Sequence, residues 1–179
     1  MRILLSVILS STLLLSGCSA LLNLADTSEI SLNNLQSIEV TQIQVPAIPK
    51  GTKDGEYLRY YPNGELKYKS WVTKGCYDRY VNAYYNNGKL QMSMPLKNCQ
   101  VNGVIKKYQP NGRINSEMTI RNGVPYGAFK FYHDTPKNGV YLQGFMENGA
   151  ITGVVKQLDE NGNVVNKAQV LDGEVKILK

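Results

Sequence analysis

The chain has little of the chemistry on which enzymes and metal sites depend. Its 179 residues include a single histidine, His133, and three cysteines. No HExxH motif, P-loop, dinucleotide fingerprint or nucleophile elbow is present. Carboxylates are scattered among turns, where solvation explains them, although a pair assembled across strands stays open as an alternative. We therefore expect a protein that is not an enzyme, with no catalytic residues, no cofactor and no metal site.

The sequence also lacks a cluster of basic residues. Lysine and arginine number 20 against 14 acidic residues, and these charges are spread along the chain. Without an arginine-rich stripe to hold phosphates, no nucleic acid is expected as a partner. The moderate positive charge fits an acidic protein partner or lipid head groups better.

Only the N-terminus holds a sustained apolar run. Residues 1–17 contain one basic residue, Arg2, followed by the apolar run and a few small residues. This layout is typical of a secretory signal peptide, and the run is too short to span a bilayer comfortably. No second segment approaches about 20 apolar residues, so nothing else is expected to cross the membrane. Removal of the leader takes Arg2 away and leaves a net charge of +5 (19 − 14).

The end of this leader resembles the lipobox of bacterial lipoproteins. The residues that carry the resemblance are Leu15, Ser16, Gly17 and Cys18. It implies that Cys18 is acylated and becomes the first mature residue, with two or three acyl chains that anchor the protein to the membrane. Ser19 stands where inner-membrane lipoproteins tend to have aspartate, which favours the outer membrane of the bacterial cell envelope. The alternative is an ordinary secreted protein with a chance cysteine.

Residues 18–52 lack the pattern of the rest of the chain and are interpreted as a lipidated tether. A short strand is predicted near its end, where Pro46 and Pro49 stop it. We expect this strand to pair with an edge of the sheet formed by residues 53–179. Its alternating apolar residues are Ile38, Val40, Ile43 and Val45.

Residues 53–179 repeat with a period of about 24 residues. Each repeat has aromatic or apolar residues followed by Asn-Gly, a pair that favours a type I′ turn between two strands. Each repeat is therefore predicted to be a β-hairpin, and the fourth has a lengthened turn that contains His133, expected to be a solvated loop residue. The blocks are residues 60–64, 84–88, 108–112, 131–139 and 158–162.

The hairpins carry columns of apolar residues that stacking against neighbours would bury. Two of the columns stand three residues apart, whereas residues on one face of a regular strand are two apart. Either a bulge intervenes or both faces of the sheet are partly covered. The two columns are Tyr57, Val81, Ile105, Phe129 and Val155, and then Tyr60, Tyr84, Tyr108, Tyr132 and Leu158, with Leu66, Leu90, Ile114 and Val164 after the turns.

The repeated block G-x-aromatic/aliphatic-x-x-Y-x-x-N-G-x-L resembles the MORN-variant repeat of the YwqK-type antitoxin family. It is found at residues 55–66, 103–114 and 153–164, and the resemblance covers the part of the chain from residue 55 onward. Two blocks depart from it, because Arg79 replaces a leading glycine and the fourth turn is longer. The resemblance implies an all-β fold, an elongated twisted antiparallel sheet of about five stacked β-hairpins, and a role in binding another protein.

Cys76 and Cys99 are predicted to form a disulfide, since an even pair in an exported domain favours one. The two positions are symmetric about the turn at residues 87–88, so an unbroken two-residue hairpin would place them opposite each other. Two free thiols are the alternative. A metal site is less favoured, because two cysteines and one distant histidine supply too few ligands.

One column suggests a surface for a partner. Lys106, Lys130 and Lys156 recur at corresponding positions, and on a stacked sheet they would line up beside the tyrosines. The alternative is that these lysines only keep the solvent face soluble. Two tyrosines, Tyr61 and Tyr85, are further candidates, because exposed rings could contact a partner or stack on sugars.

The leading hypothesis is a lipid-anchored, non-catalytic protein-interaction module on the periplasmic side of the outer membrane, bound through the lipid on Cys18. One specific form is an immunity protein that neutralises a toxin. The alternatives are a scaffold or assembly lipoprotein of an envelope complex, and a carbohydrate-binding module or enzyme. The sequence leaves open the partner, the sheet face that it uses, the oligomeric state and the orientation across the outer membrane.

Overall fold

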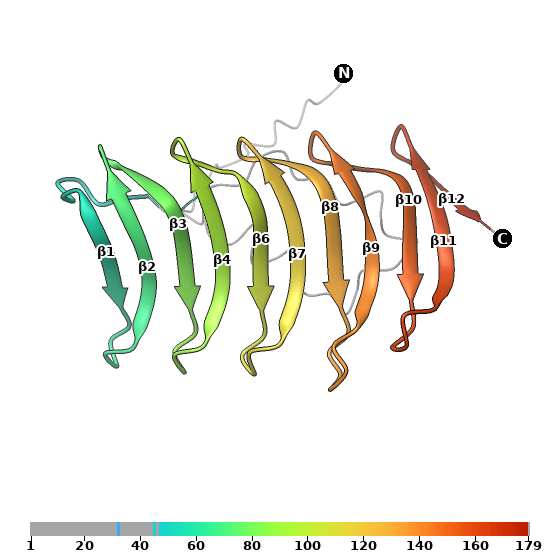
Figure 1. The fold of residues 1–179 in the computed structure, drawn as a ribbon, viewed down its shortest axis with the longest axis horizontal. Helices are drawn as coiled ribbons and strands as arrows, with labels where there is room; N and C mark the ends of the chain where they lie inside the picture. The colour runs from blue at the N-terminus through green and yellow to red at the C-terminus, as the bar shows by residue number, and fades with distance from the viewer. Residues whose placement is uncertain (1–31, 33–44, 46, 179) are drawn as a thin grey trace, which may run out of the picture.

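The computed structural model describes residues 32, 45 and 47–178, and they form one open antiparallel sheet (Figure 1). Strands follow one another along the sheet in chain order, and only the short β5 lies off this path, paired with β4. The predicted all-β sheet of stacked hairpins is confirmed. The strands are β1 (Gly55–Tyr60), β2 (Leu66–Thr73), β3 (Cys76–Tyr84), β4 (Leu90–Lys97), β5 (Gln100–Val101), β6 (Gly103–Tyr108), β7 (Ile114–Arg121), β8 (Val124–Tyr132), β9 (Val140–Glu147), β10 (Ala150–Leu158), β11 (Val164–Leu171) and β12 (Glu174–Leu178).

The Asn-Gly pairs that define the repeat form a different turn from the one predicted. At the first of them, the N–H of Gly64 donates to the carbonyl of Tyr61 at 3.0 Å, and Gly64 alone has a positive φ, of 87°. This is a type I turn followed by a left-handed glycine, so the type I′ prediction is wrong here. Asn63 has an ordinary backbone and uses its side-chain oxygen to accept the N–H of Glu65 at 3.1 Å. The equivalent glycines are Gly88, Gly112 and Gly162, and Asn138 takes this position in the fourth turn.

True type I′ turns lie at the opposite edge of the sheet and connect successive repeats. Both central residues have positive φ, which two-residue hairpins of this type require. The sequences of these turns also favour type I′, since the second central residue is glycine in four of the five. The pairs are Lys74-Gly75, Asn98-Cys99, Asn122-Gly123, Asn148-Gly149 and Asp172-Gly173.

A β-bulge lies next to each turn, on the outgoing strand of the hairpin. In the first hairpin, Arg59 pairs with Tyr68, but the next residue, Tyr60, pairs with Leu66, so one residue of β2 is left over. The same register shift precedes Tyr84, Tyr108, Tyr132 and Leu158. The incoming strands, which carry both columns, have no extra residue between them, so the two columns point to opposite faces. Phe129 lies in the core, whereas Tyr132 contacts Glu117 on the other face. Of the two alternatives given by the sequence, partial covering of both faces is therefore the correct one.

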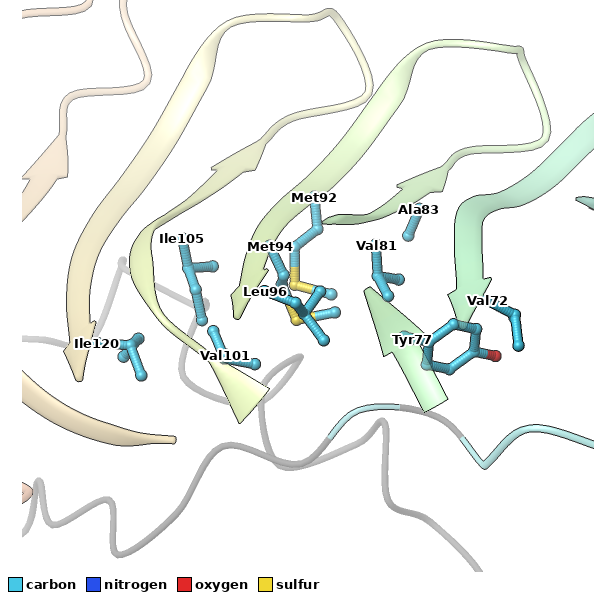
Figure 2. Packing of buried hydrophobic residues seen from close by; sticks show 10 residues of the cluster. All are labelled: Val72, Tyr77, Val81, Ala83, Met92, Met94, Leu96, Val101, Ile105 and Ile120. Atoms are coloured by element: carbon cyan, nitrogen blue, oxygen red, sulfur yellow. The ribbon is translucent and has the colours of Figure 1, made fainter. Parts of the chain in front are cut away.

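The core lies on one face of the sheet, in two clusters. Figure 2 shows the first, in which apolar side chains from neighbouring strands β2 to β7 pack side by side. The second is built around Phe129, Leu142 and Val155, all at most 1 % exposed. Cross-strand pairs such as Val81–Met94 and Met118–Phe129 continue this apolar row from strand to strand.

Three described residues of the predicted tether contact the core face. Leu32 packs in the second cluster with only 6 % of its surface exposed, while Val45 and Ile48 pack against the first. The tether therefore contributes to the core as well as linking it to the N-terminus. The strand predicted around residues 38–45 lies almost wholly outside the described residues.

Candidate interaction surface

A continuous row of mostly polar residues crosses the face of the sheet opposite the core. Its members are direct cross-strand partners, from β1 to β12, and most precede or follow a core residue in sequence. Because successive strand residues point to opposite faces, this polar row faces away from the core. In order across the sheet it contains Leu58, Lys69, Asn82, Ser93, Lys106, Glu117, Lys130, Gln143, Lys156, Lys167 and Leu178.

The structure places Lys106, Lys130 and Lys156 on this one row, on alternate strands β6, β8 and β10. They differ in their surroundings. Lys106 forms an ion pair with Glu117 at 3.2 Å, and the other oxygen of this carboxylate accepts the hydroxyl of Tyr132 at 3.0 Å. Burial, and then this hydrogen bond, raise the pKa of Tyr132 to about 12. The basic character of the row is therefore partly neutralised at Lys106.

Lys130 and Lys156 have different surroundings, although Lys130 also stands directly across from Glu117. Among the described residues, neither takes part in an ion pair, and both pair across strands with the neutral Gln143. A hollow of about 220 Å³ lies between them, lined also by Ala128, Val154 and the backbone of Gly144. The two lysines stand on either side of Gln143 along the row and line the same hollow, an arrangement suited to an incoming carboxylate.

Exposed apolar residues lie next to these lysines on the same face. Val104, Phe145 and Val154 are each about two-fifths exposed. Val104 and Val154 stand two residues before Lys106 and Lys156, and Phe145 stands two residues after Gln143, so all three share the face of the polar row. Charged groups interleaved with exposed apolar groups are a surface composition found at protein interfaces.

The first repeat matches a known family of repeats. Residues 53–70, which span β1, its turn and the first part of β2, match the family described as MORN repeat variant. The chain contains MORN-like repeats. The match covers one repeat, and the hairpins that follow at the same spacing reproduce its turn and its bulge.

Solved structures similar to the stacked MORN-like repeats have low sequence identity to the chain. They include a glycosylation-associated protein complex from Streptococcus agalactiae (15 % identity, 70 % of this chain and 23 % of that one, TM-score 0.36). A second is the GtfA/B complex bound to UDP and GlcNAc (11 % identity, 79 % of this chain and 26 % of that one, TM-score 0.40). A third is S. aureus TarM with fondaparinux, alpha-GlcNAc-glycerol and UDP (11 % identity, 68 % of this chain and 21 % of that one, TM-score 0.34). The chain thus spans about a quarter of these solved chains. No curated protein matches it in sequence.

Tyr61 and Tyr85 connect adjacent MORN-like repeats. The hydroxyl of Tyr61 donates to the carbonyl of Tyr84, and that of Tyr85 donates to the carbonyl of Tyr108, both at 2.7 Å. At the corresponding place, Nε2 of His133 lies 3.1 Å from the carbonyl oxygen of Leu158. The three side chains therefore link the first turn to the second, the second to the third and the fourth to the fifth, at the edge of the sheet. Contact of the two tyrosine rings with a partner stays a prediction.

Replacing Tyr85 with phenylalanine is expected to lower the free energy of unfolding by about 0.5–1.5 kcal/mol, because one inter-repeat hydrogen bond is lost while the ring is kept. Urea denaturation of the variant and the wild type measures the difference. Tyr60→Phe is the matched control, since Tyr60 is 57 % exposed and its hydroxyl has no hydrogen bond within the described chain. Equal stability of the two variants would contradict this structural role.

Cys76 and Cys99 form a disulfide, as the sequence predicts, with their Cα atoms 5.5 Å apart. Cys76 begins β3, directly after the turn at Lys74-Gly75, and Cys99 lies in the next turn along the same edge. Cys99 has φ of 64° and stands where the other four turns of this edge have glycine. The disulfide therefore joins two neighbouring inter-repeat turns and closes the β3–β4 hairpin at its open end.

Arg79 departs from the repeat pattern in the sequence, but the sequence does not predict which residue its side chain contacts. Its φ of 68° is positive, as is the φ of the glycines at the corresponding positions of the other repeats, Gly55, Gly103, Gly127 and Gly153. The guanidinium lies 4.5 Å from the ring centroid of Trp71, the single tryptophan of the chain. This cation–π contact offsets part of the backbone strain at Arg79. The sequence alone could not indicate the contact, because Arg79 and Trp71 come together only through the pairing of β2 with β3.

Cys18, the predicted lipidation site, lies outside the described residues, as does the signal peptide. No helix in the described part of the chain is long and apolar enough to cross a membrane. Within that part there is also no group of three or more histidine, cysteine, aspartate or glutamate residues that could hold a metal ion.

Proposed function

We propose that the protein is a lipid-anchored, non-catalytic interaction module of the bacterial envelope that presents the polar row to an acidic protein. The observation that carries this proposal is the hollow between Lys130 and Lys156, where two lysines that form no ion pair among the described residues flank Gln143. Charges arranged in this way speed the encounter with a complementary surface and fix its register. The exposed Phe145 and Val154 add apolar area beside them.

The packing of Leu32 supports a position close to the membrane. Acylation of Cys18 would leave 14 peptide steps (32 − 18) between the anchor and Leu32 on the core face. A chain of that length reaches at most about 50 Å. The sheet would thus stay near the outer membrane. There it would meet a partner that is delivered to the envelope or assembled in it.

The specific form that we propose is an immunity protein, in line with the likeness to YwqK-type antitoxin repeats. Such a protein blocks a toxin by covering part of its surface, which needs an interface and no catalytic group. A strain that lacks the protein should be more sensitive to neighbouring toxin-producing cells. Unchanged sensitivity, together with capture of an abundant envelope assembly, would instead identify a scaffold.

Reversing the charge of both lysines tests the surface directly. We expect Lys130→Glu with Lys156→Glu to reduce capture of the partner at least about tenfold, because two attractions become repulsions and about 1.4 kcal/mol is enough for that factor. The measurement is crosslinking in cells of the source organism, purification through a C-terminal tag and quantification of the captured protein.

A matched control has the same net charge as this double variant, but its two substitutions lie away from the polar row. Lys74→Glu with Lys97→Glu alters the same number of charges at two exposed turn-edge positions of the sheet. This control should capture the partner within about twofold of the wild type, since distant exposed charges are screened by salt. Equal loss in both double variants would show a general effect of charge and would remove the polar row as the interface.

A further inference from the structure

A second cavity, of about 240 Å³, lies at the turn edge between the second and third hairpins. Tyr85, Tyr108 and Pro110 form part of its wall, and three polar side chains, Gln91, Lys107 and Asn115, reach it from β4, β6 and β7. It is separate from the hollow on the polar row, because Lys107 follows Lys106 and points to the other face. This site is independent of the proposed function.

Lys107 is an unusual residue for its position. It is only 8 % exposed, and the corresponding residues one repeat before and after are Ala83 and Phe131, which are buried apolar residues of the two core clusters. Burial lowers the pKa of Lys107 to about 8, so the ammonium form still predominates at neutral pH. A buried lysine where neighbouring repeats bury apolar groups destabilises the sheet, and such residues are found where charge serves binding.

Asn115 gives the cavity a second unusual group. It is also only 8 % exposed, and its Oδ1 atom has no hydrogen-bond partner among the described residues. A buried amide oxygen without a donor is costly, so a ligand that donates a hydrogen bond there stabilises the site. A hydroxyl group suits this place, because it can donate or accept and therefore serves either orientation of the amide.

We propose that this cavity binds a small hydroxycarboxylate of the size of one acidic sugar. The carboxylate pairs with the ammonium of Lys107, and a ring hydroxyl donates to Oδ1 of Asn115. An ammonium has three N–H donors, so Lys107 can hold the ligand alongside contacts that it makes within the chain. The cavity is smaller than those that take drug-sized ligands, which limits the ligand to about a single sugar ring.

The test titrates D-glucuronate into the purified full-length chain and follows binding by calorimetry and by the NMR side-chain amide signals of Asn115 and Gln91. D-glucose has the same ring without the carboxylate, and acetate has the carboxylate without hydroxyls. We expect saturable binding of glucuronate that shifts both amide signals, with glucose and acetate at least about tenfold weaker. No saturation of glucuronate binding by about 10 mM, which corresponds to an affinity too weak to be specific, would overturn the proposal.

Two variants assign the binding to these residues. Lys107→Gln keeps most of the side-chain volume, and Asn115→Asp keeps the shape but places a negative charge against the ligand carboxylate. Each should reduce the affinity for glucuronate at least about tenfold, whereas Lys97→Gln, an equal loss of charge at an exposed residue of β4, should leave it unchanged. Wild-type affinity in a folded Lys107→Gln or Asn115→Asp protein would overturn the assignment. If one variant does not fold, the other variant and the comparison of glucuronate with glucose still test whether these residues bind the ligand.

Discussion

Replacing Phe129 with alanine is expected to lower the free energy of unfolding by about 3–5 kcal/mol. Phe129 is 1 % exposed, its ring centroid lies 5.8 Å from that of Phe131, and it belongs to the cluster that Leu32 completes. A single-layered sheet has few neighbours that can move into the space left by the ring, so the cavity should persist. Urea denaturation followed by circular dichroism measures the change.

The same ring explains why residue 144 is glycine. A Cβ atom placed there would lie 2.8 Å from two atoms of the Phe129 ring and 3.1 Å from a methyl group of Val155. Gly144→Ala should therefore destabilise the sheet by about 1–3 kcal/mol through overcrowding. In a Phe129→Leu background the clash is relieved, so the two changes should together cost at least about 0.5–1 kcal/mol less than the sum of their separate effects.

A second glycine provides the control for this cycle. Gly162 has φ of 85° and no atom within 4 Å of an added Cβ, so its replacement by alanine strains only the backbone. Gly162→Ala should destabilise the protein and yet show no coupling to Phe129→Leu, because the two sites share no contact. Additive behaviour of Gly144→Ala with Phe129→Leu would contradict the close packing described here.

The sequence predicted the hairpins because their signal is local. Asn-Gly pairs at regular spacing mark chain reversals whatever the turn type, and the columns around Val81 and Ile105 identify the core face. The turn type itself was wrong at the repeat-defining pairs. It depends on how many residues separate the last paired positions, such as Tyr60 and Leu66, and the bulge that sets this number is fixed by cross-strand pairing.

The candidate surface, like the fold, was predictable from the sequence only in part. A constant period aligns Lys106, Lys130 and Lys156 on any stacked sheet, and the structure shows that alignment. The carboxylate beside Lys106 was not predictable, since Glu117 becomes its neighbour only through the register of β6 with β7. Lys107 was missed because a lysine next to another lysine in sequence looks solvent-exposed, and its burial follows from the alternation of faces.

Loss of the disulfide is expected to lower the free energy of unfolding by about 3 kcal/mol. The bond joins residues separated by 23 positions, and closing a loop of that size restricts the unfolded chain by about this amount in the chain-entropy model. Cys76→Ser with Cys99→Ser should therefore unfold at a lower urea concentration than the oxidised wild type. Reduction of the wild type by a thiol should give a similar loss, and no loss under either condition would show that the bond does not contribute.

The backbone of Cys99 allows the covalent and conformational effects to be separated. Its φ of 64° is one that serine tolerates poorly and glycine adopts freely, and Gly75, Gly123, Gly149 and Gly173 occupy the same place in the other four turns. Cys76→Ser with Cys99→Gly should therefore be more stable than Cys76→Ser with Cys99→Ser by about 1 kcal/mol, although both lack the disulfide. Equal stability of the two double variants would mean that the turn relaxes once the bond is gone, because only a turn held in its type I′ form makes serine worse than glycine there.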